Sequence, residues 1–118
     1  NDGFPKVVDY LYDHFDEFKL LLTSGENSVY QEFIHRVVEL DTECTVKYIK
    51  ASGNDAITSG RLTPELNHLL SSAFYTGMFE VIIHDMPKAQ ALEHIRKMRR
   101  FYTAGWQTIF STDGGDVV

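Results

Sequence analysis

The chain has 118 residues, of which 43% are hydrophobic and 24% charged, and its formal net charge is −6 at pH 7. This composition is typical of one globular domain with a core, and the acidic balance argues against direct nucleic-acid binding, which needs a basic surface. The single cysteine, Cys44, excludes an internal disulfide, and neither a signal peptide nor a membrane span is predicted. We therefore expect a cytoplasmic protein with no membrane partner.

The first half of the chain predicts three helical segments. Apolar residues recur at helical spacing from Lys6 to Thr23, with a bend near Asp13–His14 that divides the stretch into two short helices. A longer amphipathic helix begins at Asn27 or Ser28, both good N-cap residues, and ends near Lys50. Each segment has one apolar side, so each needs a neighbour to cover it.

The most apolar part of the sequence is the helical region that follows residue 62. Residues 51–62 contain the Gly, Asn, Asp and Ser of a loop, and Thr63-Pro64-Glu65 then supplies an N-cap, a first-turn proline and a first-turn acid. The helix that follows, predicted from Pro64 to Asp85, is apolar on most of its sides. One small domain cannot cover all of that surface, and the simplest partner is a second copy of the chain.

The last predicted helix runs from Lys88 to Phe110, after the break at Met86-Pro87. The basic side chains between Arg96 and Arg100 lie on its solvent side rather than forming a nucleic-acid site. The expected fold is an all-α bundle of about five helices, in which the last two are long and antiparallel and form a four-helix-bundle dimer interface. Residues 1–110 would form the ligand-binding and dimerisation domain, and residues 111–118 a flexible tail.

Few residue patterns indicate catalysis. Glu32 and His35, and likewise Glu65 and His68, have the spacing used in di-metal helical bundles, but they flank polar sides or first turns and are expected to be solvated. Cys44 has no evident base beside it, and phosphate-binding loops and serine elbows do not occur. We therefore predict a protein that is not an enzyme and has no cofactor and no metal. A small di-metal enzyme is retained only as a minor alternative.

Four stretches carry a family resemblance: residues 13–21 (DHFDEFKLL), 62–66 (LTPEL), 73–85 and 101–106 (FYTAGW). Together they resemble the C-terminal, effector-binding and dimerising region of TetR-type transcriptional regulators, from about Val7 to Phe110. The resemblance implies a regulatory domain that homodimerises and binds a small-molecule effector. In that family an N-terminal helix-turn-helix domain binds DNA. No such domain precedes Lys6 in this sequence, so DNA would be bound only through a missing N-terminal domain.

The resemblance and the helix faces yield two candidate residue sets. The dimer interface, from the match of the last two helices, comprises Leu70, Phe74, Gly77, Val81, Leu92, Ile95, Met98 and Tyr102. The ligand set, chosen from helix faces to suit a small apolar or aromatic effector, comprises His14, Phe18, Phe33, Val37, Cys44, Tyr48, Tyr75 and Met78. Any of these residues could instead be ordinary core. The alternative function is a helical protein–protein interaction module unrelated to transcription.

Overall fold

The computed structural model describes residues 4–23 and 27–111, which form five α-helices and, within those ranges, no strand. The helices are α1 (Phe4–Asp13), α2 (Phe15–Thr23), α3 (Asn27–Ser52), α4 (Pro64–Ile83) and α5 (Lys88–Phe110). The all-α expectation is confirmed, and so is the bend that separates the first two helices. The tail expected to be flexible, apart from Ser111, lies outside the described residues.

The start of α4 follows from its cap. Thr63 has extended backbone angles (φ −95°, ψ 162°), and its side-chain oxygen accepts a hydrogen bond from the Leu66 amide at 3.1 Å. Pro64 occupies the first turn, where the missing amide hydrogen is not needed, and Glu65 lies near the positive end of the helix dipole. The predicted capping sequence therefore fixes this helix start.

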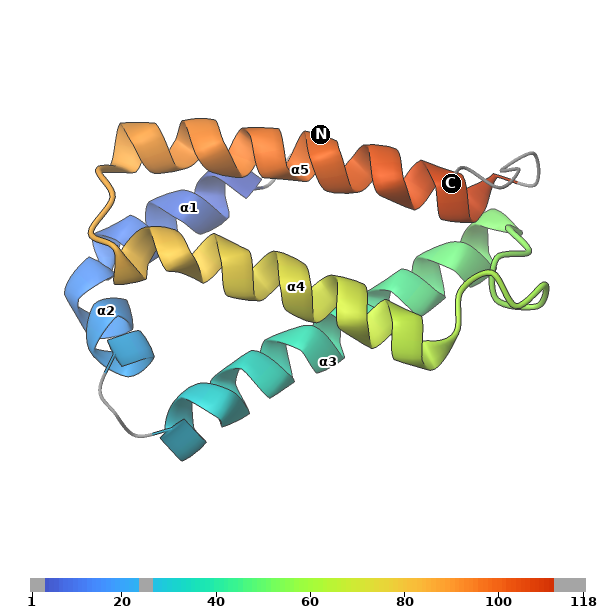
Figure 1. The fold of residues 1–118 in the computed structure, drawn as a ribbon, viewed down its shortest axis with the longest axis horizontal. Helices are drawn as coiled ribbons and strands as arrows, with labels where there is room; N and C mark the ends of the chain where they lie inside the picture. The colour runs from blue at the N-terminus through green and yellow to red at the C-terminus, as the bar shows by residue number, and fades with distance from the viewer. Residues whose placement is uncertain (1–3, 24–26, 112–118) are drawn as a thin grey trace.

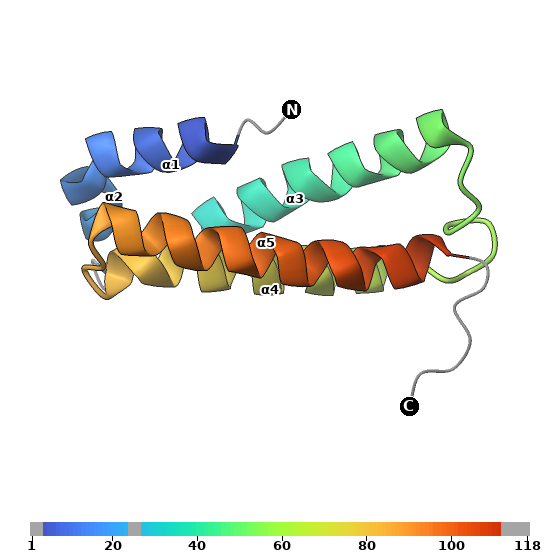
Figure 2. The same cartoon turned by 90° about the horizontal axis from the view of Figure 1, so that it is seen from above.

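The helices form two layers, visible in Figures 1 and 2. The antiparallel pair α4 and α5 makes one layer, and α1 and α3 cover one side of that pair, with α2 at the end where α4 turns into α5. The main core lies between the layers and draws buried side chains from all five helices: Val8, Leu11, Leu22, Ile34, Val38, Met78, Phe79, Val81, Ile82, Ala91 and Ile95. The other three helices leave the opposite side of the α4–α5 pair uncovered (Figure 2).

A second, smaller core fixes the loop between α3 and α4. Ile49, Ala56 and Leu62 are buried there, and aromatic residues near the end of α5 pack on them. Arg61 donates from Nε to the Ile109 carbonyl at 2.7 Å, and Asn54 donates from Nδ2 to the Phe110 carbonyl at 3.0 Å. These bonds satisfy carbonyls that the end of a helix leaves without partners. The loop is therefore attached to the last turn of α5.

The α4–α5 connection turns at Asp85, whose φ of 55° lies in the left-handed region. The Asp85 amide donates to the Ile82 carbonyl and the Met86 amide to the Val81 carbonyl, the pattern of a Schellman C-cap. The Asp85 carboxylate also pairs with Lys19 of α2 at 2.5 Å. One residue thus ends α4 and links it to α2.

We expect Asp85→Val to destabilise the protein by about 1–3 kcal/mol relative to Asp85→Gly, because a β-branched residue is strained at positive φ. Both variants lose the Lys19 pair, so the comparison isolates the backbone conformation. Urea unfolding of the two variants measures the difference. Equal stabilities would mean that the left-handed conformation at residue 85 is not required.

No helix within the described ranges is both long and apolar enough to cross a membrane.

Candidate functional site

Side chains of α3, α4 and α5 line a groove, which we name the α3–α5 groove. It contains a cluster of polar side chains around Asp41. α3 packs against α4, its backbone makes no close approach to α5, and side chains near its C-terminal end contact the last turns of α5. Two adjoining hollows of about 210 Å³ and about 450 Å³ share Thr45, Thr103 and Trp106. The smaller is also lined by Asp41, Leu70, Ser71, Phe74, Tyr75, Arg99 and Tyr102, and the larger by Cys44, Tyr48, Gln107 and Phe110.

Asp41 is the centre of the polar part of this groove. Ser71 of α4, only 3% exposed, donates from Oγ to one carboxylate oxygen of Asp41 at 2.6 Å, and the Tyr75 hydroxyl donates to the other at 3.5 Å. Hydrogen bonds to a carboxylate are stronger than those between neutral groups. The network explains why a serine interrupts the apolar α4 helix, and it joins α4 to the middle of α3.

Burial first, and then the negative charge of Asp41, raises the pKa of Tyr75 to about 12. Between the ordinary tyrosine pKa of 10.0 and this value, the unfolded chain loses the proton while the folded chain keeps it. The contribution of Tyr75 to stability is therefore complete below pH 10 and is lost as the pH rises toward about 12. Arg99 also lines the groove, and its positive charge lowers the pKa of Tyr75.

We expect Tyr75→Phe to lose less stability than the wild type as the pH rises through this window. Urea unfolding at pH values from about 9 to about 12 measures the difference between the two proteins. Tyr10→Phe, which changes a tyrosine that is 59% exposed, is the control and should follow the wild type. An equally steep loss of stability in Tyr75→Phe and the wild type would contradict the assignment.

The aromatic part of the groove provides flat apolar surfaces. Trp106 and Phe110 stack with ring centroids 5.7 Å apart, and Tyr48 lies 6.2 Å from Phe110. Tyr48 is 63% exposed, so its ring is accessible from solvent. Aromatic surfaces beside a carboxylate, hydroxyls and a guanidinium suit a small molecule that has a ring and hydrogen-bonding groups.

The structure places only three of the eight predicted ligand residues in this groove: Cys44, Tyr48 and Tyr75. Phe18 and Phe33 pack on the main core, and Met78 is buried in it. His14 pairs with Glu17 at 3.3 Å at the α1–α2 bend, and Val37 is half-buried on α3. The eight therefore do not line one pocket, because the two halves of the 26-residue α3 have different neighbours.

Sequence reasoning did not identify Asp41, Ser71, Arg99 or Trp106 as groove residues. Asp41 and Ser71 gave one usable signal, since each is a polar residue within an apolar helical pattern. Such residues need a partner when buried. Which two polar residues meet, however, depends on how α3 crosses α4, and the spacing within one helix does not specify that crossing.

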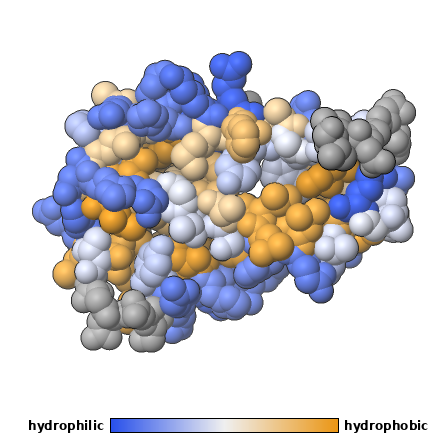
Figure 3. Space-filling view, viewed as in Figure 1, coloured by the Kyte–Doolittle hydropathy of each residue, from blue (hydrophilic) through white to orange (hydrophobic). Residues whose placement is uncertain are grey.

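The second candidate site is the uncovered side of the α4–α5 pair, here named the outer face. It is defined by Leu69, Gly77, Glu80 and His84 of α4 and by His94, Lys97, Met98 and Phe101 of α5. Figure 3 views the molecule from this side and shows apolar patches between hydrophilic edges. Leu69 is 63% and Phe101 75% exposed, and a hollow of about 520 Å³ lies along the α4–α5 seam. Glu80 pairs with His84 at 2.8 Å at one edge of the face.

Two glycines differ in their surroundings. At Gly77 an added Cβ would lie 3.1 Å from the Met98 methyl group, so this glycine lets α5 approach α4 closely. At Gly105 an added Cβ would meet nothing within 4 Å. A glycine within a helix costs about 1 kcal/mol relative to alanine. For Gly105, packing within the single chain does not account for that cost.

The predicted interface residues are divided between three environments. Gly77 and Met98 lie on the outer face, whereas Leu70, Phe74 and Tyr102 line the α3–α5 groove. Leu92 packs on the main core. Val81 and Ile95 are 5% and 2% exposed and belong to the main core, and Val81 also lines the hollow of the outer face. The dimer interface itself stays a prediction.

Within the described residues, no three His, Cys, Asp or Glu side chains gather where they could hold a metal ion. Comparison of the chain with protein-family models, with curated proteins and with solved structures finds no match.

Proposed function

We propose that this chain is the regulatory domain of a TetR-type transcriptional repressor, which homodimerises through the outer face and binds a small-molecule effector in the α3–α5 groove. The observation that carries the proposal is the uncovered apolar side of the α4–α5 pair, with Leu69 and Phe101 exposed on it. The sequence resemblance gives the same role to the last two helices.

Two copies joined by their outer faces would form a four-helix bundle from two antiparallel α4–α5 pairs. In a two-fold contact the same patch is used by both copies, so each apolar centre meets the other. The edges are complementary in charge, because Glu80 on α4 of one copy can approach Lys97 on α5 of the other. The open space at Gly105 would then allow the α5 helices to approach closely.

An effector in the α3–α5 groove would act on the position of α3 relative to α5. The groove walls are side chains of α3, α4 and α5, and α4 also holds Asp41 of α3 through Ser71 and Tyr75. A ligand changes the arrangement of the dimer only if it binds one arrangement more tightly than another. We propose that this differential affinity alters the separation of the DNA-binding domains that the family resemblance implies.

Sedimentation equilibrium of the chain over about 1–100 μM tests the dimer, and native mass spectrometry reads its mass together with any retained small molecule. We expect a dimer at micromolar concentration. A stable monomer across that range would overturn the proposal. Because an apolar face can also bind a different protein, a monomer that associates only with a partner would favour a helical interaction module instead.

A further inference from the structure

The α3–α5 groove has one negative and one positive side chain, each from a different helix. Among the described residues that line its two hollows, the charged ones are Asp41 of α3 and Arg99 of α5, and both border the smaller hollow of about 210 Å³. Both residues are half-buried rather than sealed in the core, so a molecule in the hollow can reach them. A ligand that enters this hollow therefore meets a carboxylate and a guanidinium together.

Asp41 has room for a further hydrogen-bond donor. Its carboxylate offers about four acceptor positions on two oxygens. Two donors from α4 reach it, the Ser71 hydroxyl at 2.6 Å and the Tyr75 hydroxyl at 3.5 Å. Both are uncharged, so they fix the position of the carboxylate and leave its charge in place. An ammonium group on a ligand would add the positive charge that these hydroxyls do not supply.

The adjoining hollow of about 450 Å³ is aromatic. Tyr48, Trp106 and Phe110 line it, and Trp106 borders the charged hollow as well. The Trp106 and Phe110 rings stack with centroids 5.7 Å apart. Flat apolar surfaces of this kind suit the ring of a ligand. The groove therefore places an aromatic surface directly beside a carboxylate and a guanidinium.

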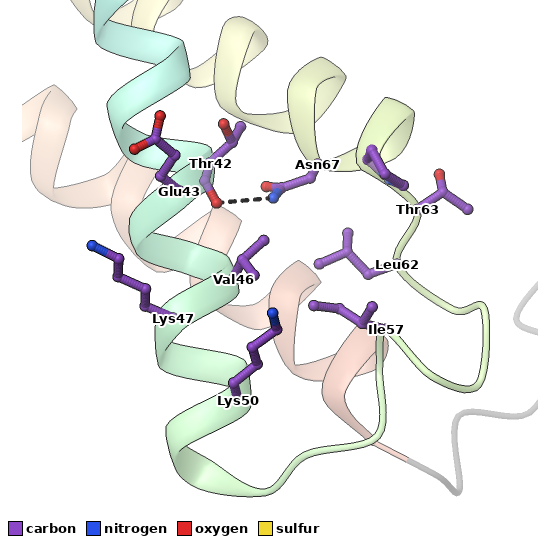
Figure 4. A pocket seen from close by; sticks show the side chains of 10 residues that line it. Thr42, Glu43, Val46, Lys47, Lys50, Ile57, Leu62, Thr63 and Asn67 are labelled. Carbon is purple, nitrogen blue, oxygen red and sulfur yellow. Dashed lines mark hydrogen bonds between the residues drawn. The ribbon is translucent and has the colours of Figure 1, made fainter.

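The hollow between α3 and the loop, shown in Figure 4, has a different arrangement. Its charged lining residues are Glu43, Lys47 and Lys50, which are all exposed and all come from α3. The loop and α4 contribute only uncharged side chains to its lining. Opposite charges on two different helices therefore distinguish the α3–α5 groove.

We propose that the α3–α5 groove binds a free aromatic α-amino acid, a ligand class that rests on the proposed effector site. The ammonium would pair with Asp41, the carboxylate with Arg99, and the ring would lie in the aromatic hollow. An α-amino acid has both charged groups on one carbon, which suits a hollow of only about 210 Å³. An aromatic ligand with a single charge would gain one of these pairings and not the other.

The test is an NMR titration of the ¹⁵N-labelled chain with tryptophan, tryptamine and indole-3-propionate, which share an indole ring and differ in charge. Trp106 is the single tryptophan of the chain, so its indole N–H signal reports on the groove. We expect tryptophan to bind about tenfold more tightly than either analogue, because each analogue lacks one charged hydrogen-bonding group. Equal affinities, or amide shifts confined to the hollow of Figure 4, would overturn the proposal.

Three variants assign the two charged groups. Asp41→Asn should weaken tryptophan about tenfold and change indole-3-propionate by less than about twofold. Arg99→Gln should weaken tryptophan about as much and leave tryptamine within about twofold. Arg100→Gln is the control for Arg99, because this neighbouring arginine of α5 lines neither hollow of the groove. Equal losses in the two arginine variants would overturn the assignment of the carboxylate.

This titration and the sedimentation experiment fail separately. A stable monomer that prefers tryptophan would support the ligand class and overturn the proposed repressor function. A dimer that binds the three indoles equally would overturn the ligand class alone.

Discussion

Phe101→Glu is expected to convert the dimer into a monomer. The Phe101 ring is 75% exposed on the outer face, and a two-fold contact would bury one ring from each copy. The substitution removes both aromatic contacts and places two carboxylates in an apolar interface. Loss of a central aromatic contact typically costs at least about 2 kcal/mol of binding, so we expect dimer affinity to fall by roughly 100-fold. Sedimentation equilibrium of the variant measures this change.

Leu20→Glu is the matched control for this experiment. Leu20 is 68% exposed on α2, away from the outer face, so the control adds the same charge to an equally accessible apolar position. It should dimerise as the wild type does, and far-ultraviolet circular dichroism should show both variants folded. If Phe101→Glu dimerised as tightly as Leu20→Glu, the outer face could not be the interface.

The helices could be predicted from sequence because their signals are local. Thr63-Pro64-Glu65 specifies the start of α4 through a cap and a dipole, and both act within one turn. The bend at His14 and the break at Pro87 are also marked by neighbouring residues. Local chemistry therefore specified the order and the approximate ends of the five helices.

The surfaces could not be predicted to the same degree, because they depend on how the helices cross. Ile95 and Met98 are both apolar residues of α5, yet Ile95 is 2% exposed in the main core while Met98 lines the outer face. The difference comes from the rotation of α4 and α5 about their own axes. In α3, Phe33 packs on the main core between α2 and α4, while Tyr48, which is 63% exposed, lies beside Phe110 at the end of α5. Sequence spacing specifies neither the rotation of a helix nor the neighbours that it meets along its length.

Ile82→Ala is expected to produce the largest loss of stability of any change considered, about 3–4 kcal/mol. Ile82 is 0% exposed in the main core, and truncating it leaves a cavity that close-packed neighbours fill only partly. For a domain of this size, such a loss lowers the midpoint of thermal unfolding by about 10–20 °C. Thermal unfolding and urea unfolding at one fixed protein concentration both measure it, since dimerisation makes the midpoint depend on concentration.

The neighbouring Ile83→Ala is the control, because it makes the same substitution one position along the same helix. Ile83 is only partly buried and packs against the edge of the core, so its truncation should cost about 1–2 kcal/mol. Helix propensity changes equally in the two variants, and the difference between them therefore reports burial alone. Equal destabilisation would mean that α4 is rotated from the orientation described. In that case the assignment of Leu69 and Gly77 to the outer face would have to change together with the core.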